Sequence, residues 1–271
     1  MLTFRLDGRP HQVPGGWAEL TGPQLLLAAP YLAQDSVAHR LAVLRAWCPA
    51  LREKDVRRLT PDQLWDMCTL VGWAWQQQMS TDVVKEFAHR GRRYQLPEPV
   101  LKDGVAIEYA MAKVYFQQFA HPRAPKLSAL DALVATLCRP ARADLATVRQ
   151  RPEWDGQTRE RYNAKLAEER ALELADAPLG VKIVVLHHFL AAQRFVHRAY
   201  RDLFKPEEVP EGPKPAAPKH SDGTEMLELL ADVAERGTYG TYEQVAHTSL
   251  HTILFNLAKQ ARHRREAERK S

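Results

Sequence analysis

An eleven-residue segment near the start of the chain recurs later with substitutions, and this repeat constrains the fold more than any other feature. Residues 4–14 align with residues 87–97, and the two copies share Phe, Gly, Arg, Gln and Pro at matching places. Each copy alternates apolar and polar residues around a glycine, which is the pattern of a β-hairpin with a tight turn. Each copy ends at a proline, and an apolar segment able to form a helix follows. The sequence therefore predicts two related hairpin-plus-helix units.

Helix signals dominate the rest of the chain. Thr21 with Pro23 is a helix start, and Thr60-Pro61-Asp62-Gln63 has the form of a capping box with proline at the first helical position. We expect the helix after Thr60 to run to about Met79 and, because it is apolar nearly all round, to lie in the interior or at a subunit contact. Residues 158–175 also have a helical pattern. The predicted fold class is α+β, mostly α: two related β-hairpin-plus-helix units in a helical body, with a small helical C-terminal module.

A proline-rich stretch marks the clearest boundary in the sequence. Residues 205–223 contain five prolines and almost no apolar side chains, a composition typical of an extended, solvated linker. We therefore expect a helical body over residues 1–204, with repeated units at about 1–80 and 81–204. The linker at 205–223 then leads to a helical C-terminal module with a basic tail at 224–271.

The net charge of +5 is concentrated at the C-terminal end. Residues 259–271 carry six basic and two acidic side chains, which leaves the rest of the chain close to neutral. A nucleic-acid-binding domain usually spreads its basic excess over a folded face, so a nucleic-acid partner is not expected. If the tail does bind nucleic acid, the candidate contacts are Arg262, Arg264, Arg265 and Arg269. A further arginine group that could contact phosphates consists of Arg139, Arg142, Arg149 and Arg151.

Composition and cysteine usage favour an ordinary globular protein of the cell interior. Apolar residues make up 45% and charged residues 26% of the chain. No uninterrupted apolar run reaches the ~18 residues needed to cross a bilayer, and the first residues lack the pattern of a signal peptide. Cys48, Cys68 and Cys138 are widely separated among apolar neighbours. They are expected to be buried, reduced thiols rather than disulfide or metal ligands.

The sequence lacks four common motifs of catalytic sites. It contains no phosphate-binding glycine loop, no dinucleotide fingerprint, no nucleophile elbow and no zinc-protease motif. His247 and His251 could point the same way on a helix, but a metal site needs further ligands at suitable spacing. We therefore predict a non-enzymatic protein without catalytic residues, cofactor or metal.

The final helix carries a narrow apolar stripe, which we predict to be the partner-binding surface. A helical hairpin of this size is only marginally stable alone, so the stripe is expected to need another molecule to cover it. Its residues are Leu250, Ile253, Leu254, Leu257 and Ala261. The hairpin edges, short and rich in Arg and His, are a second candidate surface. They could accept a strand from another subunit or be blunted against that outcome, and the sequence leaves both alternatives open.

The two ends of the chain resemble proteins encoded in tail-gene clusters of phages and prophages. Residues 245–258 are similar to a short C-terminal helical motif of phage-encoded proteins. The opening is similar to the start of small tail assembly chaperones and neighbouring tail proteins through Phe4…Gly8-Arg9…Val13-Pro14…Trp17-Ala18-Glu19-Leu20-Thr21…Gln24.

The resemblance implies a chaperone-like role in which the protein holds a tape-measure or tail-tube protein soluble until the tail polymerises. It implies a location in the cytoplasm of the host bacterium or in the virion. Three alternatives stay open. The chain could be a structural tail component of the virion that self-associates into a homo-oligomer through its hairpin edges. It could be a nucleic-acid-associated protein that uses its basic C-terminal tail, or an enzyme whose chemistry leaves no recognisable motif.

Overall fold

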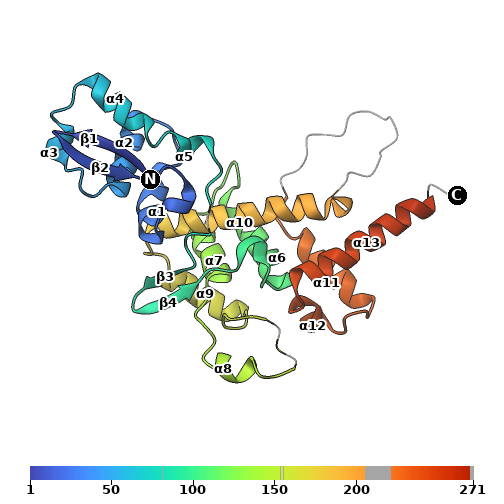
Figure 1. Cartoon of the computed structure of the whole chain (residues 1–271). Coiled ribbons are helices and arrows are strands. Elements are labelled where there is room, and N and C mark those ends of the chain that lie inside the picture. The colour runs from blue at the N-terminus through green and yellow to red at the C-terminus, as the bar shows by residue number, and fades with distance from the viewer. Residues whose placement is uncertain (81, 153, 155, 205–220, 269–271) are drawn as a thin grey trace. The chain divides into compact units, whose positions relative to one another are not determined.

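The computed structural model describes residues 1–80, 82–152, 154, 156–204 and 221–268 (Figure 1). It is 57% helical and contains two small antiparallel sheets of two strands each, which confirms the predicted α+β, mostly α class. Most of the predicted linker, residues 205–220, lies outside the described residues. The contacts divide the chain into two compact units, Met1–Phe87 with Ala177–His187 and Ala88–Asp176 with His188–Ser271. The C-terminal segment, expected from its sequence to be a separate module, is thus grouped with the second unit.

Both copies of the repeat form hairpins, as the sequence predicts. The first consists of β1 (Leu2–Leu6) and β2 (Arg9–Val13), and the second of β3 (Glu86–His89) and β4 (Arg92–Gln95). The two turn residues have positive φ angles in both hairpins: 49° and 76° at Asp7 and Gly8, and 47° and 76° at Arg90 and Gly91. Two successive positive φ angles are the geometry of a type I′ turn, whose twist matches that of the flanking strands. Glycine takes the second position without the steric cost of a Cβ.

In the first unit the hairpin is followed by short helices. The structure has η1 (Trp17–Glu19), α1 (Gly22–Ala28), η2 (Ala29–Tyr31), α2 (Val37–Trp47), α3 (Glu53–Val56), α4 (Pro61–Thr69) and α5 (Trp73–Gln76). Both predicted helix starts are present, because the side chains of Thr21 and Thr60 each accept a hydrogen bond from the backbone N–H three residues later. These helix starts follow from short-range sequence signals alone.

The helix that begins at Pro61 ends at Thr69, well before the predicted end at Met79. The chain tightens into a turn in which the N–H of Gly72 donates to the carbonyl oxygen of Thr69 at 3.0 Å. This break rotates Trp73 into the core of the unit, where it stacks on Trp47 with a centroid distance of 5.2 Å and packs edge-on against Trp17 at 4.9 Å. Packing these three indole rings together stabilises the protein more than continuing the helix would.

This segment was expected to lie in the interior or at a subunit contact, and only part of it is buried within the chain. Met67 and Cys68 of α4 are buried, but Trp65 is 55% exposed. The guanidinium of Arg40 lies over the ring of Trp65, 5.9 Å from its centroid. A charged side chain therefore covers one face of the indole from the solvent side.

The second unit is built around α6 (Ala106–Phe119) and α7 (Leu127–Leu137), which pack on each other. The other elements of this unit are η3 (Pro99–Leu101), α8 (Leu145–Val148), α9 (Ala164–Glu173), η4 (Arg201–Leu203), α11 (Glu225–Glu235), α12 (Tyr242–Ala246) and α13 (Leu250–Glu268). The predicted helix over 158–175 begins only at Ala164. Residues before it are extended because Arg159 forms a β-bridge with Ala141.

One long helix, α10 (Leu179–Ala199), contributes residues to both units. It is the one described helix whose length and mean hydropathy, 1.3 over 18 residues, would suffice to cross a membrane. Val181, Val184, Phe189 and Val196 on this helix are nevertheless buried inside the protein. A core helix passes the same composition test, so the hydropathy of α10 gives no evidence of a membrane location.

Two buried arginines organise the interior of the second unit. Nη2 of Arg139 lies 2.5 Å from Oε1 of Glu108, and Nη2 of Arg159 lies 3.3 Å from Oε2 of the same carboxylate. Arg159 also donates from Nε to Asp103 at 3.1 Å and from Nη1 to the carbonyl oxygen of Leu137 at 2.5 Å. The side chains of Glu108 and both arginines are fully buried. Buried charges persist in a protein when they are paired. Glu108 pairs both arginines, and Nε and Nη1 of Arg139 have no hydrogen-bond partner among the described residues.

This network corrects one sequence-based expectation. Arg139 was grouped with Arg142, Arg149 and Arg151 as a candidate phosphate contact, but its side chain has no exposed surface. It sits where the segment after α7 pairs with β4, since the backbones of Gln95 and Arg139 exchange hydrogen bonds of 2.8 and 3.2 Å. Arg139 is therefore a structural residue of the second unit.

Candidate binding site at the first hairpin

One face of the first hairpin is turned toward residues 50–70 and leaves two cavities there. Phe4 pairs with His11 and Leu6 with Arg9, and cross-strand partners project to the same face of a hairpin. The rings of Phe4 and His11 stack on this face, with centroids 5.2 Å apart and planes 17° apart. Leu6 lines both cavities.

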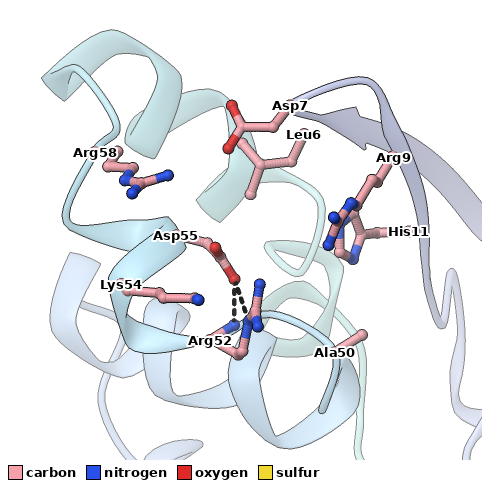
Figure 2. A pocket seen from close by; sticks show the side chains of 9 residues that line it. All are labelled: Leu6, Asp7, Arg9, His11, Ala50, Arg52, Lys54, Asp55 and Arg58. Atoms are coloured by element: carbon pink, nitrogen blue, oxygen red, sulfur yellow. Dashed lines mark hydrogen bonds and ion pairs between the residues drawn. The ribbon is translucent and has the colours of Figure 1, made fainter.

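The first cavity has a volume of about 280 Å³ and is dominated by charge (Figure 2). It is lined by four cationic side chains and two carboxylates, which are Arg9, Arg52, Lys54 and Arg58 with Asp7 and Asp55. These groups come from the hairpin tip, from α3 and from the segment that joins α3 to α4. In Figure 2 they surround one open space, with Leu6 and Asp7 on the hairpin side and Lys54 and Asp55 opposite. We call this space the basic cavity.

One ion pair is formed within the basic cavity. The backbone N–H and the Nε of Arg52 both donate to Oδ2 of Asp55, each at 3.1 Å. The Arg52 hydrogen bond holds the pKa of Asp55 below its usual value, so this carboxylate stays charged at neutral pH. Arg52 and Asp55 largely neutralise each other.

The other three cations of the basic cavity lack such a partner. Arg9, Lys54 and Arg58 are exposed, and no carboxylate lies within ion-pair distance of them among the described residues. The lining holds two carboxylates, Asp7 at the turn of the hairpin and Asp55, which also interacts electrostatically with Lys54. The cavity thus keeps an excess of positive charge that can attract an anionic group.

The second cavity is an apolar groove of about 270 Å³ between β1 and α4. Its apolar lining comes from Phe4, Leu6, Leu59, Met67 and Leu70, and its polar lining from Arg5, Gln63 and Asp66. Three successive residues of β1 line the groove, so its contents would lie beside this strand. We call it the β1 groove.

The outer edge of β1 has unpaired backbone groups. In a hairpin closed by a type I′ turn, the residues flanking the turn form a hydrogen-bonded pair and every second residue beyond them points its N–H and C=O outward. Leu6 and Arg9 flank the turn, so the outward groups on β1 are those of Thr3 and Arg5. They have no backbone partner within the described part of the chain.

The outer edge of β2 differs because it contains a proline. Pro10 lies opposite Arg5, at a position whose backbone nitrogen faces outward. Proline has no N–H, so this edge cannot complete a ladder with another strand. The sequence left open whether the hairpin edges accept a strand or are blunted. In this hairpin the β2 edge is blunted and the β1 edge is open.

Cys48, which lies close to the basic cavity, is held in a neutral state. Nδ1 of His11 lies 3.8 Å from Sγ of Cys48. Burial raises the pKa of the Cys48 thiol above its ordinary value, which keeps it protonated near neutral pH. A protonated, buried thiol packs as a small apolar side chain.

The apolar stripe predicted to bind a partner is not exposed. Leu250, Ile253 and Leu254 have no exposed surface, and Leu257 is only 7% exposed; Ala261 is partly buried. The stripe is covered because α13 packs on α6 and η4 within the second unit (Figure 1). The expectation that the final helix lacks enough of its own chain to cover it is therefore wrong.

The packing of α13 depends on backbone hydrogen bonds that sequence patterns do not indicate. The N–H of Leu250 donates to the carbonyl oxygen of Gly104, and the N–H of Ala106 donates to that of Thr248, both at 3.0 Å. His251 adds a donor to the carbonyl oxygen of Val100 at 3.0 Å. These contacts join residues that are far apart in sequence, and no local periodicity signals them.

The histidines considered as metal ligands have other roles in the structure. Nδ1 of His251 hydrogen-bonds the hydroxyl of Tyr200 at 2.9 Å, so both of its ring nitrogens are engaged. Desolvation on burial lowers the pKa of His247. Within the described residues no group of three His, Cys, Asp or Glu side chains is placed to hold a metal ion.

The arginines of the C-terminal tail are divided between exposed and partly covered positions. Arg262 and Arg265 each approach the carboxylate of Asp202, at 3.8 and 3.7 Å. Arg264 is exposed, and Arg269 lies outside the described residues. Part of the positive charge of this tail is thus offset within the protein.

The sequence patterns point to Arg9 only as part of the repeat, and they do not indicate Lys54 or Arg58 as binding residues. A usable signal lies in the run at residues 52–58, in which four cations surround two carboxylates beside a hairpin that contains another arginine. The sequence does not indicate that residues 52–58 lie beside the tip of the hairpin.

Comparison of the chain with protein-family models, with curated proteins and with solved structures finds no match.

Proposed function

We propose that this chain is a non-enzymatic, chaperone-like phage tail assembly protein that binds a tape-measure or tail-tube protein. The observation that carries the proposal is the open edge of β1 beside an apolar groove. The N-terminal segment that resembles tail-cluster proteins runs from Phe4 to Gln24, and its first residues form part of this edge and of the groove. The proposed contact surface is therefore the first hairpin, in place of the C-terminal stripe.

The binding mode that fits this surface is addition of a strand. An extended segment of the partner would hydrogen-bond the outward groups of Thr3 and Arg5, while its alternate side chains enter the β1 groove. Main-chain hydrogen bonds supply affinity and the groove selects apolar side chains. A partner strand held in this way is not free to pair with other copies, which is what a chaperone for a polymerising protein must achieve.

Thr3 and Gln12 offer a matched pair for testing the proposal. They face each other across the hairpin, and both N–H groups point outward, from β1 and from β2 respectively. Thr3→Pro removes an outward donor from the open edge, whereas Gln12→Pro removes one from the edge that Pro10 already blunts. The full chain and both variants would be co-expressed with the tape-measure and tail-tube proteins of the same gene cluster, and complexes isolated by affinity capture and size-exclusion chromatography.

We expect the wild type and Gln12→Pro to carry a tail protein and Thr3→Pro to lose most of it. Equal capture by all three proteins would reject the β1 edge as the contact surface. Failure of the wild type to retain either tail protein would reject the tail assembly function itself. Circular dichroism would confirm that both variants remain folded.

A second candidate, self-association in a virion component, draws on the same open edge. Two β1 edges could pair antiparallel and give a homo-oligomer. Light scattering of the isolated protein distinguishes the two, because a stable dimer or larger assembly that Thr3→Pro converts to monomer favours self-association.

A further inference from the structure

We infer that the segment bound at the β1 groove is an apolar strand followed by acidic side chains, and that these carboxylates enter the basic cavity. This partner chemistry rests on the proposed protein-binding function. An open strand edge alone does not restrict the sequence of the partner, whereas this inference requires apolar residues followed by acidic ones.

The charge of the basic cavity supports this occupant. Arg9, Lys54 and Arg58 are unpaired within the described residues and converge on one space of about 280 Å³. Like charges around one space repel one another, and an incoming anion reduces that repulsion. Charge complementarity also raises the rate of encounter and excludes basic segments.

The position of Leu6 connects the two cavities. Its side chain lines the end of the β1 groove and also the basic cavity. A strand rises about 3.3 Å per residue, so an extended segment that leaves the groove passes Leu6 within a residue or two. The side chains that follow the apolar part of the segment are therefore the ones that reach Arg9 and Lys54.

The lining favours carboxylates over phosphate. Asp7 and Asp55 face the same space, and two fixed negative charges oppose a phosphate dianion more than a single carboxylate. A protein segment also brings the apolar side chains that the groove requires.

The partner-independent test uses an oligoglutamate peptide as the probe. Its binding to the full chain would be measured by isothermal titration at low and physiological salt. The test variant combines Arg9→Gln, Lys54→Gln and Arg58→Gln. The matched control combines Arg194→Gln, Arg198→Gln and Arg201→Gln, which removes the same charge from exposed positions in the second unit. Neither set touches a buried residue.

We expect oligoglutamate to bind the wild type and the control, with affinity that falls as salt rises. The test variant should bind it roughly tenfold more weakly, since each exposed charge pair contributes a modest part of the total. No binding by the wild type, or equal binding by both variants, overturns the inference. Competition by inorganic phosphate at concentrations comparable to the peptide would also overturn it, in favour of a small-anion site.

The same variants separate this inference from the proposed function. In co-expression with the tail proteins, the test variant should lose the captured partner at physiological salt while the control keeps it. If both variants keep a tail protein, the acidic-segment inference fails and the tail assembly function stands. If even the wild type captures none, the function fails, and the peptide titration still decides whether the cavity binds carboxylates.

Discussion

The carboxylate of Glu108 lies 2.5 Å from the guanidinium of Arg139, and neither side chain has any exposed surface. Arg159, equally buried, contacts the other oxygen of the same carboxylate. Glu108 is thus the one group that neutralises two arginines in the interior of the second unit, among the residues that the structure describes. Removing it should be far more costly than removing an exposed partner.

Glu108→Gln is therefore expected to lower the free energy of unfolding by about 3–5 kcal/mol, because Arg139 would be left buried and without an ion-pair partner in the described structure. Urea denaturation measures the change. Arg139→Met in the Glu108→Gln background should recover part of the loss, since it removes the orphaned charge. Asp144→Asn breaks the surface ion pair with Arg142 and should leave the midpoint of the urea transition unchanged. A similar stability for Glu108→Gln and Asp144→Asn would contradict the buried network.

The docked position of the C-terminal helix predicts a contrast between two neighbouring residues. Leu254 has no exposed surface, whereas Phe255 is 57% exposed. Leu254→Ala should destabilise the protein by about 2–5 kcal/mol through lost burial and a cavity. Phe255→Ala should change the stability by no more than ~0.5 kcal/mol. Equal effects of the two substitutions in a denaturation experiment would show that α13 does not pack as described.

Close packing at Gly180 predicts a second contrast, between two glycines. A Cβ added to Gly180 of α10 would overlap the carbonyl oxygen of Leu26 in α1, so the backbones would have to separate. Gly180→Ala should cost about 1–3 kcal/mol, despite the better helix propensity of alanine. A Cβ at Gly16 meets nothing within 4 Å, and Gly16→Ala is the control. Thermal unfolding followed by circular dichroism would compare them, and a stabilised Gly180→Ala variant would rule out the contact.

Burial of Cys138 predicts how stability depends on pH in the alkaline range. Desolvation raises the pKa of its thiol from the ordinary value of 9.0 to about 12, so the folded protein keeps the proton that the unfolded chain releases above pH 9.0. The protonated thiol contributes its full stabilisation at pH values below the pKa of the unfolded chain. That stabilisation is lost as the pH rises toward the pKa of the folded protein. Between about pH 8 and pH 10 the loss should be about 1.4 kcal/mol, one pKa unit's worth.

Cys138→Ala isolates this contribution from other alkaline titrations. Between pH 8 and pH 10 the free energy of unfolding of the variant should fall by about 1.4 kcal/mol less than that of the wild type. Urea denaturation at both pH values gives the comparison. Parallel losses in the two proteins would mean that the Cys138 thiolate is as accessible in the folded state as in the unfolded chain.

Parts of the candidate site could be read from the sequence and others could not. The hairpin that carries Phe4, Leu6 and Arg9 follows from the alternation and glycine turn of the repeat. The blunted edge of β2 follows from Pro10 once the turn type is known. The approach of Lys54 and Arg58 to that hairpin has no local signal, because α3 is a single turn positioned by the packing of its neighbours.

The sequence by itself determined the elements whose causes lie within a few residues. Asp7-Gly8 and Arg90-Gly91 close both hairpins because those positions accept positive φ angles, and Thr60 starts α4 because its side chain caps the helix. Short-range backbone geometry of this kind does not depend on the rest of the chain.

Only the tertiary structure decided which apolar and charged faces are covered. A periodic stripe such as that of Leu250 and Leu254 shows that one side of a helix seeks burial, but not whether its own chain or another molecule supplies it. Arg139 likewise has the sequence appearance of a solvated cation, and it is buried because Glu108, distant in sequence, is brought beside it. Burial and charge pairing are set by contacts across the whole fold, and neither is encoded in any single segment.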